Sequence, residues 1–157
     1  NQYEIRRYEA SNWVETEISN MPLNTAKRTM FWKLFRYING QNANNQKINM
    51  TVPVLGKHGK NSNSYTMMFY LSNSIPNPPQ PIDQSVRINS LPAFTSYVRS
   101  FSGYPRTKLE WESEELALEQ SLNSDGLTFD KSYFVTAGYD APWIQDRHNE
   151  VWLFPTA

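Results

Sequence analysis

The chain has 157 residues, a length that suits one domain with a sizeable buried core. Aromatic residues are 14% and charged residues 19% of the total, as in ordered domains, and the formal net charge of zero argues against a nucleic-acid-binding protein. No apolar run approaches the roughly 18 residues of a membrane-spanning helix, so we expect no integral membrane segment. The absence of cysteine excludes disulfides and thiolate ligands. We expect a cytoplasmic protein, and an organellar or secreted location stays open.

The first half of the chain predicts two strands, a helix and two further strands. Stretches rich in β-branched and aromatic residues predict the strands, at 3–9, 12–18, 47–55 and 65–71. The helix begins near Pro22, with Asn20 as a candidate cap, and ends at Gly40. The polar stretch "GKHGKNSNS", residues 56–64, lies between the last two strands and predicts an exposed loop.

The second half repeats this order of elements after a proline-rich connector at residues 74–81. Strands are predicted at 85–89, 94–101, 132–139 and 149–154, and a helix at about 105–123. An offset of 83 residues aligns much of the two halves, for example Ile5 with Ile88 and Val52 with Val135. We therefore expect internal repeats at about 3–71 and 86–154.

The two strand–strand–helix–strand–strand units must share one core, because each unit alone would expose an apolar face. The simplest solution pairs their strands into one curved or barrel-like sheet with both helices outside. We expect a single α+β domain over residues 1–157, built from two pseudo-symmetric ββαββ repeats.

The first helix contains "RTMFWKLFRYI", residues 28–38, which is rich in both aromatic rings and cations. At about 100° per residue, a second patch lies beside the core-facing stripe. Its members are Arg28, Phe31, Trp32, Phe35 and Arg36. In one interpretation, Phe31 widens the core stripe and a loop covers Trp32 and Phe35. In the other, the patch docks a flat, apolar, anionic molecule such as a porphyrin, because rings offer stacking and Arg offers donors for carboxylates.

Few other residues suggest chemistry. His58 in the polar loop and His148 before the last strand are weak candidates for metal ligands, because they are isolated and lack HxxxH spacing. We expect His58 to be exposed. Glu150 is a candidate buried, hydrogen-bonded carboxylate with a raised pKa, acting either as a structural acceptor or as an acid/base. The acidic run of the second helix, residues 110–119, predicts a solvated face.

Several stretches, in order and across nearly the whole chain, resemble the SOUL/haem-binding protein family and its SOUL-like branch. They are "YEIRRY", "FWKLFRYINGQN", "INMTVPV", "NPPQP", "VRSFSGY", "TAGYDAPW" and "HNEVWL". The resemblance implies a distorted antiparallel β-barrel flanked by two helices and built from a repeated unit. It also implies binding of haem and related tetrapyrroles without enzymatic turnover. A protein partner, an anti-apoptotic regulator, is implied through a segment like residues 116–134.

The resemblance also assigns positions. In the haem-binding branch the tetrapyrrole lies against the first helix, and its contacts map onto Arg28, Phe31, Phe35 and Arg36. The axial histidine placed in the first strand motif of SOUL-like members is Arg7 here, and arginine cannot ligate iron. The family's lysine before the last strand is also missing, although Arg147 of this chain is near that position.

We therefore expect non-enzymatic binding and carrying of haem or another tetrapyrrole, such as a porphyrin, bilin or chlorophyll derivative, on the first-helix patch. Two alternatives stay open. One is a protein-interaction module with a partner of the apoptosis-regulator type. The other is an enzyme that modifies a tetrapyrrole or another small molecule, with Glu150 as the acid/base.

Overall fold

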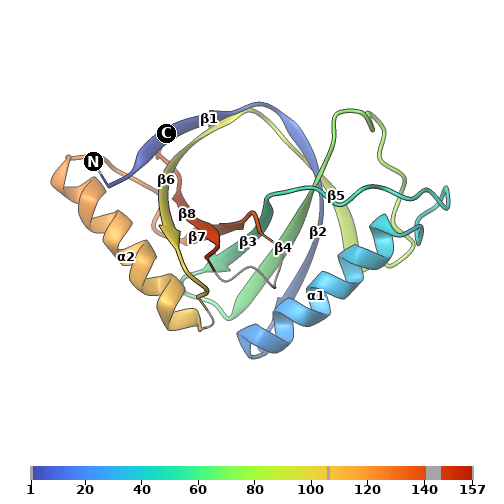
Figure 1. The fold of residues 1–157 in the computed structure, drawn as a ribbon, viewed down its shortest axis with the longest axis horizontal. Coiled ribbons are helices and arrows are strands. Elements are labelled where there is room, and N and C mark those ends of the chain that lie inside the picture. Colours follow the sequence, from blue (N-terminus) through green and yellow to red (C-terminus); the bar gives the residue numbers. More distant parts are fainter. Residues whose placement is uncertain (1, 106, 141–145, 157) are drawn as a thin grey trace.

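The computed structural model describes residues 2–105, 107–140 and 146–156. In this part of the chain, eight antiparallel strands form one sheet that curls into a half-barrel, with two helices outside it (Figure 1). The strands are β1 Glu4–Tyr8, β2 Ser11–Ser19, β3 Val54–Gly59, β4 Ser64–Leu71, β5 Val86–Leu91, β6 Phe94–Ser102, β7 Tyr133–Gly138 and β8 His148–Leu153. The helices are α1 Leu23–Ile38 and α2 Lys108–Ser124. The predicted α+β class with two flanking helices is confirmed.

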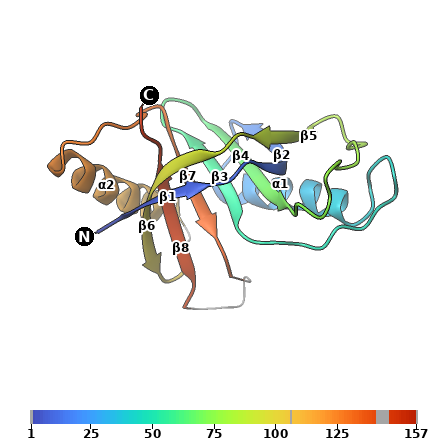
Figure 2. The same ribbon diagram turned by 90° about the horizontal axis from the view of Figure 1, so that it is seen from above.

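The strand order in the sheet is β1-β6-β8-β7-β3-β4-β2-β5, so β3 and β7 pair at its centre. The order of elements along the chain runs strand–strand–helix–strand–strand twice, as predicted. The duplication of the two halves as structural repeats stays a prediction. Figure 2 shows the two helices apart from each other, α2 beside β6 and β8 and α1 beside β2 and β4.

The outer face of the sheet carries two apolar cores, one under each helix. On α1, the side chains of Ala26, Met30 and Leu34 are buried against β2 and β4, which is the core stripe expected from the 3.6-residue period. Gly40 ends the helix with a φ of 107°, a conformation that favours glycine. Asn20 does not cap α1, because Pro22 occupies the N-cap position and no side chain bonds the first turn.

Helix α2 packs Trp111, Leu118 and Leu122 against the other half of the sheet. Its acidic run is less solvated than predicted. Glu115 is 5% exposed and lies 2.7 Å from the ammonium of Lys60, which also pairs with Glu119. Burial raises the pKa of Glu115 to about 7. The solvated-face prediction is therefore wrong for this residue, because its side chain is buried and pairs with Lys60, the residue after β3.

Strand β3 begins later than predicted and passes through the segment expected to be an exposed loop. Gly56 lies within the strand, where a Cβ would stand 2.8 Å from Oγ1 of Thr136 on β7. The glycine thus allows close packing of strands and does not mark a turn. His58 is 3% exposed, and its ring stacks on Phe134 with 4.7 Å between centroids. The prediction of an exposed His58 is wrong.

Candidate functional site

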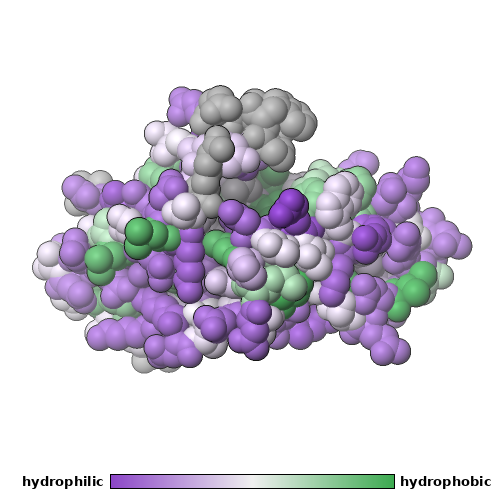
Figure 3. All heavy atoms as spheres, turned by 90° about the horizontal axis from the view of Figure 1, so that it is seen from below, coloured by the Kyte–Doolittle hydropathy of each residue, from purple (hydrophilic) through white to green (hydrophobic). Residues whose placement is uncertain are grey.

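A groove of about 1030 Å³ lies on the outer face of the sheet, between α1 and the start of α2, with β3 and β7 as its floor. In Figure 1 the first turns of the two helices approach each other at the lower edge. Figure 3 views this side, where green, apolar patches lie near the middle of the face and also toward both ends, among mostly hydrophilic atoms. The residues that line it include Lys27, Phe31, Phe35, Gly56, Trp111 and Arg147.

The aromatic part of the predicted patch borders this groove. Phe31 and Phe35 are half-buried and line it, with stacked rings 5.9 Å apart. Trp32 is 50% exposed and sets its ring edge-on to both phenylalanines, at 5.7 and 5.6 Å. Phe31 also contacts Phe69 of the core, so it widens the apolar stripe as one interpretation expected. No described segment seals the three rings, so an open aromatic wall remains.

The two predicted cations, unlike the aromatic rings, do not line the groove. Arg28 and Arg36 are exposed on the solvent side of α1 and do not belong to the groove lining. The reason is the helical angle, because both residues follow Phe35 around the helix, away from the sheet. The structure thus brings Phe31, Trp32 and Phe35 together and places the two guanidiniums outside the groove.

Two other cations line the groove, and sequence reasoning had not assigned either to the site. The Nζ of Lys27 lies 5.4 Å from the ring centroid of Trp111. Loss of hydration lowers the pKa of Lys27, and the nearby charge of Arg147 lowers it further. Viewed down the helix axis, Lys27 projects between Leu34 and Ile38, inside the apolar arc that faces the core. A cation at such a position could have indicated from the sequence that Lys27 belongs to a site.

Arg147 comes from the chain just before β8. Its guanidinium lies over the ring of Tyr104 at 4.5 Å, and one of its terminal nitrogens donates to the backbone oxygen of Asp140 at 2.9 Å. The carboxylate of Asp140, which also lines the groove, accepts from the backbone N–H of His148 at 2.6 Å. Within the described residues, neither Lys27 nor Arg147 forms an ion pair with an acidic side chain.

Two donors on residues that line the groove lack a hydrogen-bond acceptor. Nε of Arg147 and Nε1 of Trp111 are buried without an acceptor among the described residues. A buried donor left unpaired costs about 1–3 kcal/mol, so these two groups lower the stability of the free protein. An apolar wall beside unpaired donors and cations fits a planar, apolar molecule that carries carboxylates, as a tetrapyrrole does.

The histidines do not build a metal site. The residues that the structure describes hold no group of three or more His, Cys, Asp or Glu side chains able to bind a metal together. Burial lowers the pKa of His58 to about 3, helped by the charges of Lys27 and Lys108, so this ring is neutral near pH 7. It lies on the groove side of β3 but outside the groove lining. Arg7, which replaces the family's candidate ligand, is exposed on β1 at the edge of the sheet.

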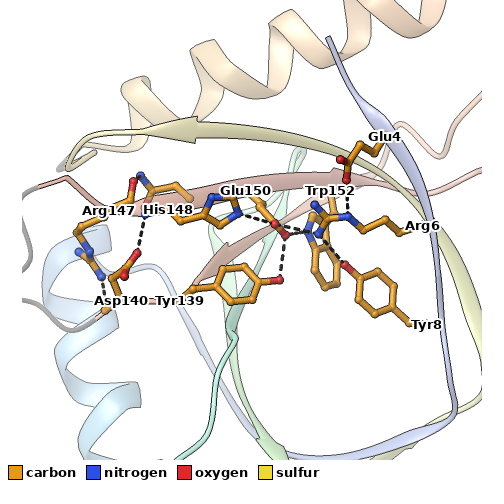
Figure 4. A network of polar contacts seen from close by, with 10 residues as sticks. Glu4, Arg6, Tyr8, Tyr139, Asp140, Arg147, His148, Glu150 and Trp152 are labelled. Atoms are coloured by element: carbon orange, nitrogen blue, oxygen red, sulfur yellow. Dashed lines mark hydrogen bonds and ion pairs between the residues drawn. The ribbon is translucent and has the colours of Figure 1, made fainter. Parts of the chain in front are cut away.

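Glu150 lies on the opposite, inner face of the sheet, because residues alternate along β8 and its neighbour Val151 packs under α2. Its carboxylate is 1% exposed and accepts four hydrogen bonds (Figure 4). The donors are Arg6 at 2.9 Å, His148 at 2.8 Å, Trp152 at 2.8 Å and Tyr139 at 3.0 Å. Burial alone would raise the pKa of Glu150, but these bonds prevail and lower it. The expected burial is confirmed, and the expected raised pKa is wrong.

Most large apolar side chains of the segment proposed to engage a protein partner are buried in the core. In residues 116–134, the side chains of Leu118, Leu122 and Phe129 are buried in the core on the outer face of the sheet, while Leu116 is exposed.

Among the described residues, no helix is long and apolar enough to cross a membrane.

The domain is a curled antiparallel sheet with two outer helices, and the groove between them has the size of a small-molecule site. The family described as SOUL heme-binding protein matches residues 1–154, and the chain belongs to this family. It is 37% identical to heme-binding protein 2 from Homo sapiens, over 96% of this chain and 77% of that protein. It is 29% identical to heme-binding protein 1 from Mus musculus, over 96% of this chain and 83% of that protein.

Solved structures share the fold at low identity. The C-terminal domain of EcmrR aligns with a TM-score of 0.71 and 12% identity, over 98% of this chain and 96% of that one. A hydrolase from Listeria innocua aligns with a TM-score of 0.63 and 8% identity, over 99% and 92% of the two chains. At these identities the likeness concerns the fold alone.

Proposed function

We propose that this protein binds haem or a related tetrapyrrole, without turnover, in the groove between α1 and α2. One observation carries the proposal: the half-buried rings of Phe31 and Phe35 open onto a groove of about 1030 Å³ that also presents Lys27 and Arg147. Small-molecule sites in proteins commonly measure about 300–1,000 Å³ and combine apolar walls with a few polar groups. The names of the relatives, heme-binding proteins 1 and 2, support the same ligand class.

Each side chain has a physical part in the proposal. Phe31 and Phe35 offer apolar area and stacking to a flat ring, and the half-exposed Trp32 extends that wall. Arg28 and Arg36 form the outer rim of the proposed site, where they meet ligand groups that project toward solvent. When haem is bound, its iron supplies the redox and small-ligand chemistry of the group. The protein's own residues bind and orient the ring and exclude water from it.

A titration with haemin tests the proposal. Binding to the wild-type chain would appear as a shifted Soret band and as quenching of tryptophan fluorescence. Phe35→Asp should weaken binding by at least about tenfold, because it places a charge against an apolar ring. Leu109→Asp is the matched control, because Leu109 is exposed on α2 and does not line the groove. Equal affinity of the Phe35→Asp variant and the wild type would place the ligand elsewhere.

The same titration extends to an iron-free porphyrin, a bilin and a chlorophyll derivative, which share a conjugated tetrapyrrole skeleton with carboxylate side chains, open-chain in the bilin and cyclic in the others. The two alternatives have weaker sites. The carboxylate of Glu150 is engaged by four donors, and the apolar side chains of residues 116–134 are mostly buried. A carrier that holds a tetrapyrrole without changing it is therefore the function that the groove supports best.

A further inference from the structure

We infer that Lys27 and Arg147 form the carboxylate-binding end of the groove, so that a bound tetrapyrrole lies with an acidic edge between the starts of α1 and α2. This inference rests on the proposed function and adds a requirement to it. The ligand must carry at least one free carboxylate, and that carboxylate goes to the inner cations in preference to the exposed Arg28 and Arg36.

The charged side chains that line this end of the groove are unbalanced. Lys27 and Arg147 both line the groove, and the charge of Arg147 contributes to the lowered pKa of Lys27. Asp140 also lines the groove, but its carboxylate accepts the backbone N–H of His148, and no ion pair joins it to Lys27 or Arg147 among the described residues. Two neighbouring cations sharing a low-dielectric groove are stabilised when an anion enters between them.

Lys27 is held in place by an aromatic ring and not by an acidic side chain. The face of the Trp111 ring attracts the ammonium through a cation–π contact, which fixes its position without neutralising its charge. Nε of Arg147 and Nε1 of Trp111 find no acceptor among the described residues. A carboxylate offers several lone pairs and no proton near pH 7, so it satisfies this end where a neutral ester would do so poorly.

Lys27 and the Trp111 ring that it contacts both lie near the N-terminus of a helix. Lys27 lies near the start of α1, which begins at Leu23, and Trp111 lies in the first turn of α2, which begins at Lys108. The N-terminus of a helix carries a partial positive charge and favours anions. The partial positive charges of these two helix N-termini therefore add to the attraction that the two cations exert on an anion.

The experiment compares haemin with haemin dimethyl ester, which keeps the ring and the iron but lacks free carboxylates. Both probes are titrated against the wild type and the variants Lys27→Met and Arg147→Met. Lys33→Met is the matched control, because it removes the same charge from α1, where Lys33 bonds the Ser85 hydroxyl at 3.0 Å. Lys27→Met should weaken haemin binding by about tenfold or more, while its affinity for the ester stays within about twofold of the wild type.

Two results would overturn the inference and leave the proposed function standing. In the first, the wild type binds haemin and Phe35→Asp weakens that binding, yet Lys27→Met and Arg147→Met bind both probes like the wild type. In the second, the two variants lose haemin and the ester equally, which means that Lys27 and Arg147 only shape the groove. Failure of the wild type to bind haemin at all would remove the proposed function itself.

Discussion

Lys27 of α1 lies over the indole ring of Trp111 of α2, with 5.4 Å between Nζ and the ring centroid. This contact joins the two helices at the end of the groove where their first turns meet (Figure 1). Within the described residues no acidic side chain pairs with the ammonium. The free protein therefore retains a partly dehydrated, uncompensated charge, which lowers its stability and is available to an anionic ligand.

Lys27→Met should raise the free energy of unfolding of the free protein by about 1–2 kcal/mol near pH 7, because it removes that charge and keeps the apolar stem. Chemical denaturation measures the change, with Lys33→Met as the control expected to stay close to the wild type. The stabilising effect of Lys27→Met and its weakening of haemin binding would together identify a residue retained for the ligand. A destabilised Lys27→Met variant would contradict this account.

The advantage of Lys27→Met should also depend on pH. Because the folded-state pKa of Lys27 lies below its ordinary value of 10.5, the unfolded chain binds more protons in the interval between the two. The contribution of Lys27 to stability therefore rises with pH across that interval. The gap between variant and wild type should be widest below the folded-state pKa and should close as the pH approaches 10.5. A gap that stays constant into the alkaline range would contradict the lowered pKa.

His58 should make the protein sensitive to acid. Its pKa of about 3 in the folded state lies below the ordinary 6.5, because the ring is buried and the cations Lys27 and Lys108 are near. Between these values the unfolded state binds the extra proton, so stability falls as the pH falls from about 6.5 toward 3. The slope of this one group reaches at most about 1.4 kcal/mol per pH unit.

The variant His58→Phe keeps a flat ring against Phe134 and cannot take up a proton. Its free energy of unfolding, measured from pH 7.5 to 4.5, should fall less steeply than that of the wild type. Subtracting the two curves removes the contribution of the carboxylates, which both proteins share. Parallel curves over this range would show that His58 does not titrate as its burial requires.

The helices and most strands could be predicted because their signals are local. The core stripe of α1 follows the helical period, and the same period places Phe31 and Phe35 beside it. The strand through Gly56 and His58 was missed because a glycine needed for contact with Thr136 resembles a glycine needed for a turn. Only the pairing of β3 with β7 distinguishes the two cases.

The groove itself could not be predicted in full, because it joins segments that are distant in the sequence. Lys27 is recognised as a site residue only together with Trp111 and Arg147. These two residues come to the same groove through the packing of α2 and β8 on the sheet. Glu150 shows the same limit. Its burial was expected, but the direction of its pKa depends on donors from β1 and from the end of β7, Arg6 and Tyr139.

Gly56→Ala should destabilise the protein by about 1–3 kcal/mol, because the new methyl group would stand 2.8 Å from Oγ1 of Thr136. Thermal unfolding measures the loss. Thr136→Ala removes the opposing hydroxyl, so the double variant should recover part of that loss and show a favourable coupling energy. Additive effects of the two changes would mean that the close approach of β3 and β7 does not explain the glycine.

Glu150→Gln should destabilise the protein by about 3–5 kcal/mol, because it leaves the charge of Arg6 without its buried partner and sets an amide against donors. Glu4→Gln is the matched control. It breaks the other ion pair of Arg6, at 2.7 Å, but the side chain of Glu4 is exposed, so its loss should cost less than about 1 kcal/mol.

The effect of Glu150→Gln should be largest near neutral pH. The carboxylate's pKa is lowered in the folded state, so its contribution is complete above the ordinary value of 4.5 and is lost as the pH falls through the folded-state pKa. At a temperature where the variant stays folded, haemin affinity should equal that of the wild type, because Glu150 lies on the face of the sheet opposite the groove. Haemin binding that disappears with Glu150→Gln, while Phe35→Asp and Lys27→Met bind normally, would move the ligand to the inner face and reopen the enzymatic alternative.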